Sequence, residues 1–170
     1  VQDQRPILGA VYQPRKKTLF WAMTGERAHI KIQGKPTRRL SVSKRKNYSS
    51  AVAVLGTTDS PQTINIYQSL GAQTTSPVGS FTYKLGMILQ QKADLYIKPN
   101  QRCHEWDSAA MEVILHEAGG KLTDLYGNPL EYNKEDPQHK KGIVASNGRI
   151  HDQVIDFLQR EYISTGKIKL

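Results

Sequence analysis

The alternation of strand-like and helix-like segments after residue 48 constrains the fold of this chain more than any other feature. Short apolar runs typical of buried strands take turns with longer stretches that carry apolar residues at helical spacing. This alternation predicts a layered α/β domain with helices on both faces of a sheet. The strands are expected at 51–55, 73–77, 94–98, 121–125, 130–132 and 142–146, and the helices at 60–70, from 80 past 89, at 107–118 and from 147 to 162.

The first part of the chain follows a different pattern. Three strand-like runs, at 7–12, 18–23 and 28–32, are separated by turn signals with no helix-like segment between them. They predict an antiparallel meander, which needs another layer to pack on. A polar, basic connector at 34–48 is expected to be a solvated loop. We therefore divide the chain into residues 1–47 and residues 48–170.

Charge and composition narrow the class of partner. The 170 residues include 24 Lys and Arg against 15 Asp and Glu, so the net charge is +9. Such a charge favours an anionic partner: nucleic acid, a membrane surface or a phosphorylated small molecule. Nucleic acid is the less favoured of these, because no aromatic residues interleave the basic runs of the connector.

Other classes are excluded by simple counts. Apolar runs are far shorter than the ~20 residues of a membrane helix, and the chain opens with polar residues rather than a signal peptide. Cys103 is the single cysteine, so neither an internal disulfide nor a Cys-rich zinc site can form. We expect a protein of a reducing compartment, the cytoplasm.

The sharpest candidate for chemistry is Asp107. It is expected where a loop after a strand enters a helix, and the helix dipole favours an ionised carboxylate there. An ionised carboxylate is a hard oxygen ligand of the kind that Mg²⁺ prefers. On the residues alone, a helix cap without further function is the favoured interpretation.

A second candidate is the helix start at Gly79-Ser80. Free backbone amides and the Ser80 hydroxyl at such a start can bind an anion or a sugar hydroxyl. Lys84 lies one turn further on, within reach of a bound phosphate. The alternative is a helix cap followed by an ordinary surface lysine.

The stretch Trp106-Asp107-Ser108-Ala109-Ala110 to Glu117-Ala118-Gly119-Gly120 resembles the second signature of the inositol monophosphatase superfamily. The resemblance covers nearly the whole chain, and further matching segments are Pro77 to Ser80, Lys92 to Tyr96 and Gly142 to Asn147. Within this superfamily, the sequence from Gly120 to Leu130 is more similar to the 3'(2'),5'-bisphosphate nucleotidase branch.

The resemblance implies a Mg²⁺-dependent, lithium-sensitive phosphomonoesterase with the layered sandwich of the sugar phosphatases. Asp107 matches the aspartate that binds metal and serves catalysis. The resemblance also implies the residues that bind substrate, which are Gly79, Ser80, Phe81, Lys84 and Lys98. Lys98 stands where inositol phosphatases carry an acidic residue, so it favours an added phosphate. The implied substrate resembles 3'-phosphoadenosine 5'-phosphate, with inositol monophosphate as the alternative.

One departure from the family pattern is large. The first signature, aspartate-proline-x-aspartate-glycine-threonine, is absent from this sequence, as is the upstream glutamate pair. One carboxylate cannot hold two Mg²⁺ ions, since each needs several oxygen ligands. We therefore expect the chain to be the C-terminal portion of a phosphatase and to be inactive alone.

The expected partner is the missing N-terminal half, in cis before cleavage or as another chain. The sheet edge formed by 7–32 would otherwise be exposed and could support a homodimer. A hypothesis of another class is a non-catalytic module that binds anions or nucleic acid and has lost its metals.

The remaining polar residues near the site are expected to be structural. His104 and His116 need not carry protons, because a metal-bound water requires no histidine base. Cys103 gives no sign of reactivity. Glu117 is expected to support the turn that follows its own helix rather than to bind metal.

Overall fold

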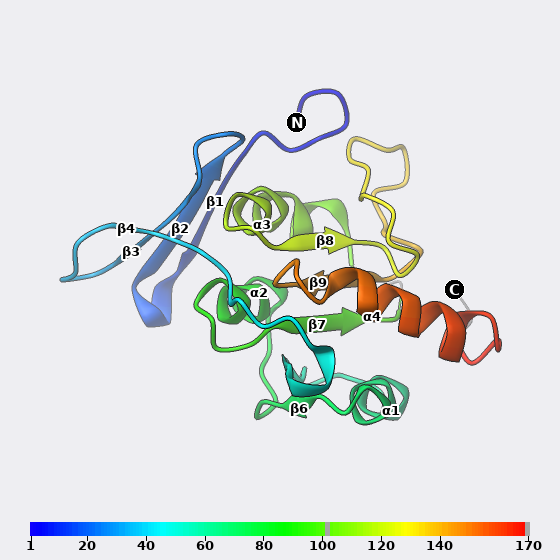
Figure 1. The fold of residues 1–170 in the computed structure, drawn as a ribbon. Coiled ribbons are helices and arrows are strands. Elements are labelled where there is room, and N and C mark those ends of the chain that lie inside the picture. Colours follow the sequence, from blue (N-terminus) through cyan, green and yellow to red (C-terminus); the bar gives the residue numbers. More distant parts are fainter. Residues whose placement is uncertain (101–102, 169–170) are drawn as a thin grey trace.

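A computed structural model describes residues 1–100 and 103–168 and shows four stacked layers (Figure 1). A four-stranded sheet forms the first layer, helices α2 and α3 the second, a five-stranded sheet the third, and helices α1 and α4 the fourth. The predicted layered α/β architecture is therefore confirmed.

The first sheet is antiparallel, in the order β1-β2-β3-β4. Its strands are β1 (Leu8–Gln13), β2 (Thr18–Met23), β3 (Ala28–Ile32) and β4 (Arg38–Arg39). The three-stranded meander is present, but the connector is not wholly a loop, because β4 pairs with β3. Arg38 and Arg39 keep their side chains exposed while the backbone pairs, so polarity hid this strand.

Strand alternation gives the first sheet two different faces. Phe20, Ala22 and Ile30 point inward and are fully buried against α2 and α3. On the other face Leu8 is 63 % exposed and Tyr12 is 58 % exposed. The outer face is thus apolar and open to solvent in the described part of the chain.

The second sheet is mixed, in the order β6-β5-β7-β9-β8. Its strands are β5 (Val52–Ala53), β6 (Gln73–Thr74), β7 (Leu95–Lys98), β8 (Lys121–Thr123) and β9 (Ile143–Ser146). β5 is parallel to β6 and β7, whereas β9 is antiparallel to β7 and β8. The strand expected at 130–132 does not form; an isolated bridge just before it joins Pro129 to Thr123.

The helices are α1 (Pro61–Leu70), α2 (Phe81–Leu89), α3 (Glu105–Glu117) and α4 (His151–Leu158). α1 begins with a Ser60 side-chain cap and ends at Gly71 in the left-handed conformation. α3 begins two residues before the expected start. α4 begins after Asn147, whose side chain accepts the amides of Arg149 and Ile150, and it continues into the π-helix η3 (Gln159–Ile163).

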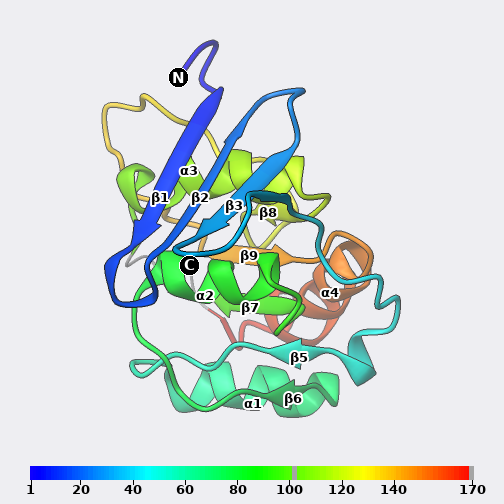
Figure 2. The same cartoon turned by 90° about the vertical axis from the view of Figure 1, so that its left-hand side faces the viewer.

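Two separate cores follow from the period of β7 and β9 (Figure 2). Tyr96 and Ala145 face α2 and α3, whereas Leu95, Ile97 and Val144 face α1 and α4. Both faces of this sheet are covered, which explains why its strands read as continuous apolar runs. No helix in the described ranges is long and apolar enough to cross a membrane.

The connector is fixed to the second sheet by one buried carboxylate. Asp94 accepts hydrogen bonds from the Arg45 Nε and the Val52 amide, both at 2.8 Å, and from the Ser43 hydroxyl. Asn147 also donates to the Ser43 hydroxyl, at 2.8 Å. The segment between the two predicted parts of the chain is therefore anchored, and not a free linker.

Candidate functional site

The predicted site residues gather at one edge of the second sheet. β5 leads to Gly56, which bridges in parallel to Val78, directly before Gly79. β7 ends at Lys98, and α3 starts a few residues later. The carboxyl ends of parallel strands share one edge, and in open α/β sheets this edge is where ligands bind.

Asp107 is the third residue of a capping box and is also accessible to solvent. It lies in the first turn of α3, and its Oδ2 accepts the His104 amide at 3.0 Å in a capping box. Its side chain is nevertheless 38 % exposed. The His104 ring stacks on Trp106 at 4.5 Å between centroids. The expected position of Asp107 at the cap itself is wrong, because His104 occupies that place.

The start of α2 is unusual at Ser80. This residue has φ of 61°, in the left-handed region that favours glycine. Its hydroxyl pairs with the Thr82 hydroxyl at 3.0 Å, and within the described residues the helix start has no side-chain cap. A Cβ at Gly79 would meet only the Thr57 hydroxyl, at 3.9 Å, and the Phe81 ring packs edge-on against Tyr96. The first amides of α2 thus lack the side-chain cap that the alternative interpretation assumed.

Lys84 is not a surface lysine. Its side chain is buried, its Nζ donates to the Tyr96 hydroxyl at 3.0 Å, and the ammonium lies 4.6 Å from the centre of the Tyr96 ring. Burial lowers the pKa of Lys84, while the Asp59 carboxylate acts in the opposite direction. The interpretation of Lys84 as an ordinary exposed residue is therefore wrong.

Asp59 joins the site, although the sequence pattern did not single it out. A Cβ at Gly56 would lie 2.5 Å from Asp59 Oδ1 and 2.6 Å from Lys84 Nζ, so both charged groups converge on this glycine. Asp59 Oδ2 also accepts the Gly56 amide at 2.7 Å. Its place just beyond a buried strand is the signal that could have revealed it.

Cys103 lies among the charged residues of the site. Burial raises the pKa of its thiol to about 12; Lys98 and Lys84 oppose this, and Asp107 adds to it. The thiol is therefore protonated and unreactive at neutral pH. Lys84, Lys98 and Asp107 are thus each close enough to influence the Cys103 thiol electrostatically.

The described residues do not make a complete metal centre. Within residues 1–100 and 103–168 no group of three or more His, Cys, Asp or Glu side chains is placed to hold an ion. Asp107, accessible and anionic, suits one oxygen ligand of a divalent cation, but not the whole set.

Two other residues of α3 are structural. Glu117 accepts the amides of Gly25 at 2.8 Å and Arg27 at 3.0 Å, so it holds the turn between β2 and β3. The expectation that it supports the turn after its own helix is wrong, because the folded first sheet brings this other turn beside it. His116 accepts the Leu122 amide at 3.2 Å and joins α3 to β8.

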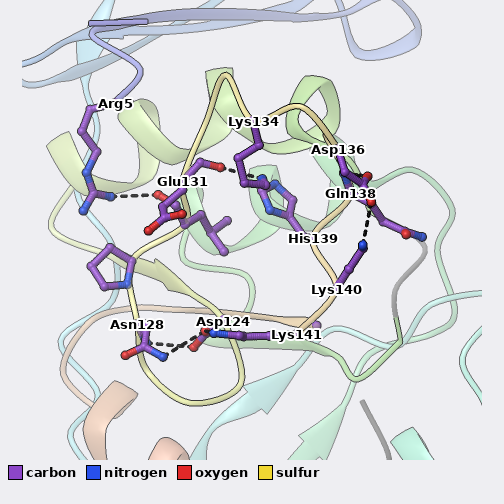
Figure 3. Close-up of a pocket in the computed structure, with 13 residues that line it drawn as sticks. Arg5, Asp124, Asn128, Glu131, Lys134, Asp136, Gln138, His139, Lys140 and Lys141 are labelled. Carbon is purple, nitrogen blue, oxygen red and sulfur yellow. Dashed lines mark hydrogen bonds and ion pairs between the residues drawn. The ribbon is translucent and has the colours of Figure 1, made fainter. Parts of the chain in front are cut away.

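A separate hollow of about 690 Å³ lies under the loop between β8 and β9 (Figure 3). Its described lining comes from this loop and from Arg5, and it includes Gly142, whose neighbour Ile143 pairs with Lys98. Lys140 pairs with Asp136 at 2.7 Å, and Lys134 pairs with Glu105 at 2.8 Å. Because its charges are compensated in this way, the hollow is a weak candidate for an anion site.

Beneath this hollow a buried polar network crosses α3. Tyr132 hydrogen-bonds to both Glu112 and the Ser108 hydroxyl, and Ser108 Oγ lies 2.7 Å from His139 Nε2. Burial raises the pKa of Glu112 to about 7, although Tyr132 and Arg5 act against this. Burial and the Lys134 charge lower the pKa of His139 to about 4, so this ring is neutral at pH 7.

Comparison with known proteins finds a matching family and similar enzymes. Residues 1–162 match the Inositol monophosphatase family. The chain is 43% identical over 79 residues to 3'(2'),5'-bisphosphate nucleotidase 1 of Mus musculus, covering 46% of this chain and 26% of that protein. It is 29% identical over 161 residues to the Golgi-resident adenosine 3',5'-bisphosphate 3'-phosphatase of Callithrix jacchus, covering 89% and 41%.

The fold has solved counterparts. The IMPase of Thermotoga maritima superposes with a TM-score of 0.75 at 23% identity, over 99% of this chain and 61% of that one. The chain thus spans less than half of these curated relatives and about three fifths of this solved neighbour.

Proposed function

Because the chain belongs to the inositol monophosphatase family, we propose that it forms the phosphate-recognising part of a phosphomonoesterase. The observation that carries this proposal is the uncapped start of α2 beside the sheet edge where β7 ends at Lys98 and α3 follows with Asp107 in its first turn. This edge offers an oxygen ligand, two cations and helix amides within one region.

In the proposed site the residues have distinct roles. Asp107 supplies one oxygen ligand of a Mg²⁺ centre whose other ligands come from a segment outside these residues. The amides at Ser80 and Phe81 bind phosphate oxygens, aided by the positive end of α2. Gly79 lets the phosphate approach this backbone, since it has no side chain and its one near neighbour is the Thr57 hydroxyl.

The proposed substrate is a nucleotide with two phosphates, like 3'-phosphoadenosine 5'-phosphate. Two lysines at the site match a substrate with a second anionic group better than a neutral polyol. The names of the two curated relatives, both enzymes of bisphosphates, support the same choice. Inositol monophosphate is the alternative, and Lys98→Glu should move selectivity toward it if Lys98 reads the second phosphate.

A binding function without catalysis is the second candidate. It is favoured by the incomplete ligand set in the described residues and by the net charge of +9. A non-catalytic module should bind DNA or polyphosphate with an affinity that falls steeply with salt. It should also release no phosphate when the missing ligands are restored.

The test is phosphate release by the complete protein that carries this chain, or by this chain co-expressed with the N-terminal part of the mouse relative. We expect Mg²⁺-dependent hydrolysis of the bisphosphate, sensitivity to lithium, and loss of activity in Asp107→Asn. Asp152→Asn is the control, because this exposed carboxylate lies on α4 and pairs with Lys121 of β8. Activity that survives in Asp107→Asn contradicts the proposal.

The proposal also includes a partner segment and a cellular compartment. A partner segment completes the ligand set, and the cytoplasm keeps the single thiol of Cys103 reduced.

A further inference from the structure

The segment 131–139, which we call the clamp, wraps around the first turn of α3. We propose that the clamp positions Asp107, and that Glu105 and His139 are its positioning residues. This inference rests on the proposed function only in giving Asp107 its role. The attachment itself is visible in the described contacts.

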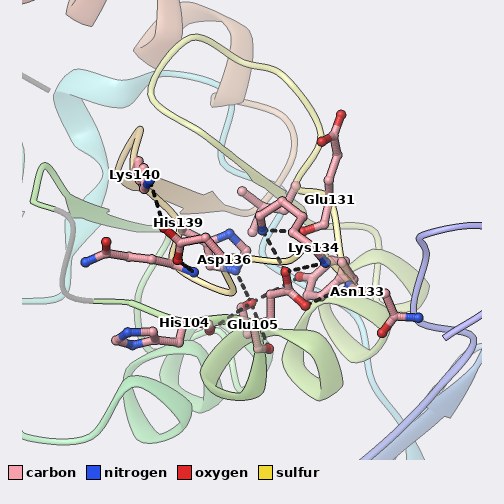
Figure 4. Close-up of polar contacts among 12 residues, drawn as sticks. His104, Glu105, Glu131, Asn133, Lys134, Asp136, His139 and Lys140 are labelled. Atoms are coloured by element: carbon pink, nitrogen blue, oxygen red, sulfur yellow. Dashed lines mark hydrogen bonds and ion pairs between the residues drawn. The ribbon is translucent and has the colours of Figure 1, made fainter.

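Glu105 is the first anchor (Figure 4). Its carboxylate accepts the amides of Asn133 at 2.7 Å and Lys134 at 3.1 Å, and the Lys134 ammonium at 2.8 Å. The Lys134 ammonium also donates to the Glu131 carbonyl at 2.9 Å, which closes the clamp upon itself. One side chain of α3 therefore holds one end of the clamp.

Backbone contacts hold the other end. The Glu105 amide donates to the Pro137 carbonyl, and the His139 amide donates to the Cys103 carbonyl, both at 2.9 Å. Between them His104 bridges to Gln138 in antiparallel fashion. The residues on either side of the helix start are thus paired with the clamp like a short ribbon.

His139 is the second anchor, on the buried side of the helix. Its Nε2 lies 2.7 Å from the hydroxyl of Ser108, the neighbour of Asp107 in the chain. Ser108 is fully buried, and Tyr132 hydrogen-bonds to the same hydroxyl at 3.2 Å. Because this hydrogen bond is short and shielded from water, it fixes how the first turn of α3 is oriented about the helix axis.

These contacts reach Asp107 through His104. The carboxylate of Asp107 accepts the His104 amide, and His104 in turn bridges to Gln138 of the clamp. His139 of the clamp contacts Ser108, the residue that follows Asp107. Movement of the clamp would therefore change the direction in which the Asp107 carboxylate points, while Lys84 and Lys98 stay in place. A supporting shell of this kind commonly sets the precision of a functional side chain.

The experiment uses the full 170-residue chain and amide hydrogen exchange at His104, whose amide reports the Asp107 contact. Glu105→Gln and His139→Leu should speed exchange at His104 by about tenfold, because each removes hydrogen bonds worth up to about 1.5 kcal/mol. His139→Gln, which can restore a partner for Ser108, should recover most of the protection.

Asp136→Asn is the matched control. Asp136 lies on the clamp and is charged like Glu105, but its carboxylate contacts Lys140 and Gln138. It should leave exchange at His104 unchanged. If the anchor variants protect His104 as well as the control does, or if exchange rises equally over the whole second sheet, the inference is overturned.

A kinetic readout separates this inference from the proposed function. In the complete protein, the anchor variants should lower kcat with little change in KM, since the lysines that meet substrate stay in place. A complete protein without phosphatase activity overturns the proposed function alone, because the exchange result still decides the role of the clamp.

Discussion

Gly56 shows how a residue without a side chain can shape a charged site. Any Cβ there would meet the ends of Asp59 and Lys84 at 2.5 Å and 2.6 Å. These ends are flexible, so they can move aside, but only by leaving their present positions. The glycine therefore sets where the two opposite charges meet.

Gly56→Ala should weaken substrate recognition more than it weakens the fold. We expect KM for the bisphosphate to rise about three- to tenfold, as for the loss of one charged hydrogen bond. The melting temperature should change by only a few degrees. Enzyme kinetics and thermal unfolding, measured side by side, check this; an unchanged KM would show that Lys84 does not meet substrate.

Glu112 makes stability depend on pH in a defined direction. Its pKa is raised to about 7 in the folded chain, so folding favours its protonated form. Its contribution is complete below pH 4.5 and is lost as the pH rises through 7. His139, with its pKa lowered to about 4, acts in the other direction: its contribution is lost as the pH falls from 6.5 to 4.

Glu112→Gln should consequently gain melting temperature relative to the native chain at pH 8 and gain less at pH 5. The amide can still accept from Tyr132, and it carries no charge that must be buried. The difference should amount to several degrees, since about 1 kcal/mol shifts the melting temperature of a chain of this size by ~2–4 °C. Thermal scans at the two pH values test this, and parallel curves would contradict it.

At the residue scale the sequence revealed part of the site. The segment around Asp107 was predicted from its motif; it forms the first turn of α3, a few residues after β7 ends, and its role in metal binding stays a prediction. Asp59 was missed, because only the fold brings it next to Lys84. Glu117 was assigned to the wrong turn for the same reason: its partners, Gly25 and Arg27, are distant in sequence.

At the element scale, periodicity predicted most helices and strands but not their ends. Helix α3 starts early because His104, not Asp107, is its cap, and cap geometry is hard to read from side-chain types. β4 was hidden in a basic segment, since backbone pairing at a sheet edge places no demand on polarity. The strand expected at 130–132 was apolar for a different reason: Tyr132 belongs to the buried network.

Asp94 connects elements from both halves of the chain, and its charge should matter for stability. Asp94→Asn keeps the shape but turns an amide nitrogen toward donors from Arg45 or Val52. We expect a loss of about 2–3 kcal/mol in the free energy of unfolding. Urea denaturation measures it, with the exposed Asp152→Asn as control; equal values for the two variants would contradict the prediction.

At the scale of the whole molecule, the layered fold was predictable from the sequence. Which metal-binding side chains the fold brings close together could be seen only in the structure. The residues proposed to bind phosphate lie near one sheet edge, and the described residues provide no group of three metal-binding side chains. The chain therefore resembles one half of a site.

Magnesium should accordingly have little effect on the isolated chain. An ion that bound the folded state tightly would raise the melting temperature by mass action. We expect a shift of less than about 1 °C between EDTA and millimolar Mg²⁺, and no phosphate release in either condition. A clear upward shift that Asp107→Asn removes would mean that this chain holds the ion by itself.

The packing of the first sheet on α3 also has a consequence for biosynthesis. β1, β2 and β3 are synthesised before α3, the helix that packs on their inner face. As the polypeptide leaves the ribosome, Phe20 and Ile30 stay uncovered until that helix has emerged. The nascent chain thus passes through a stage at which chaperones can bind these strands, and slow translation of the intervening stretch would lengthen it.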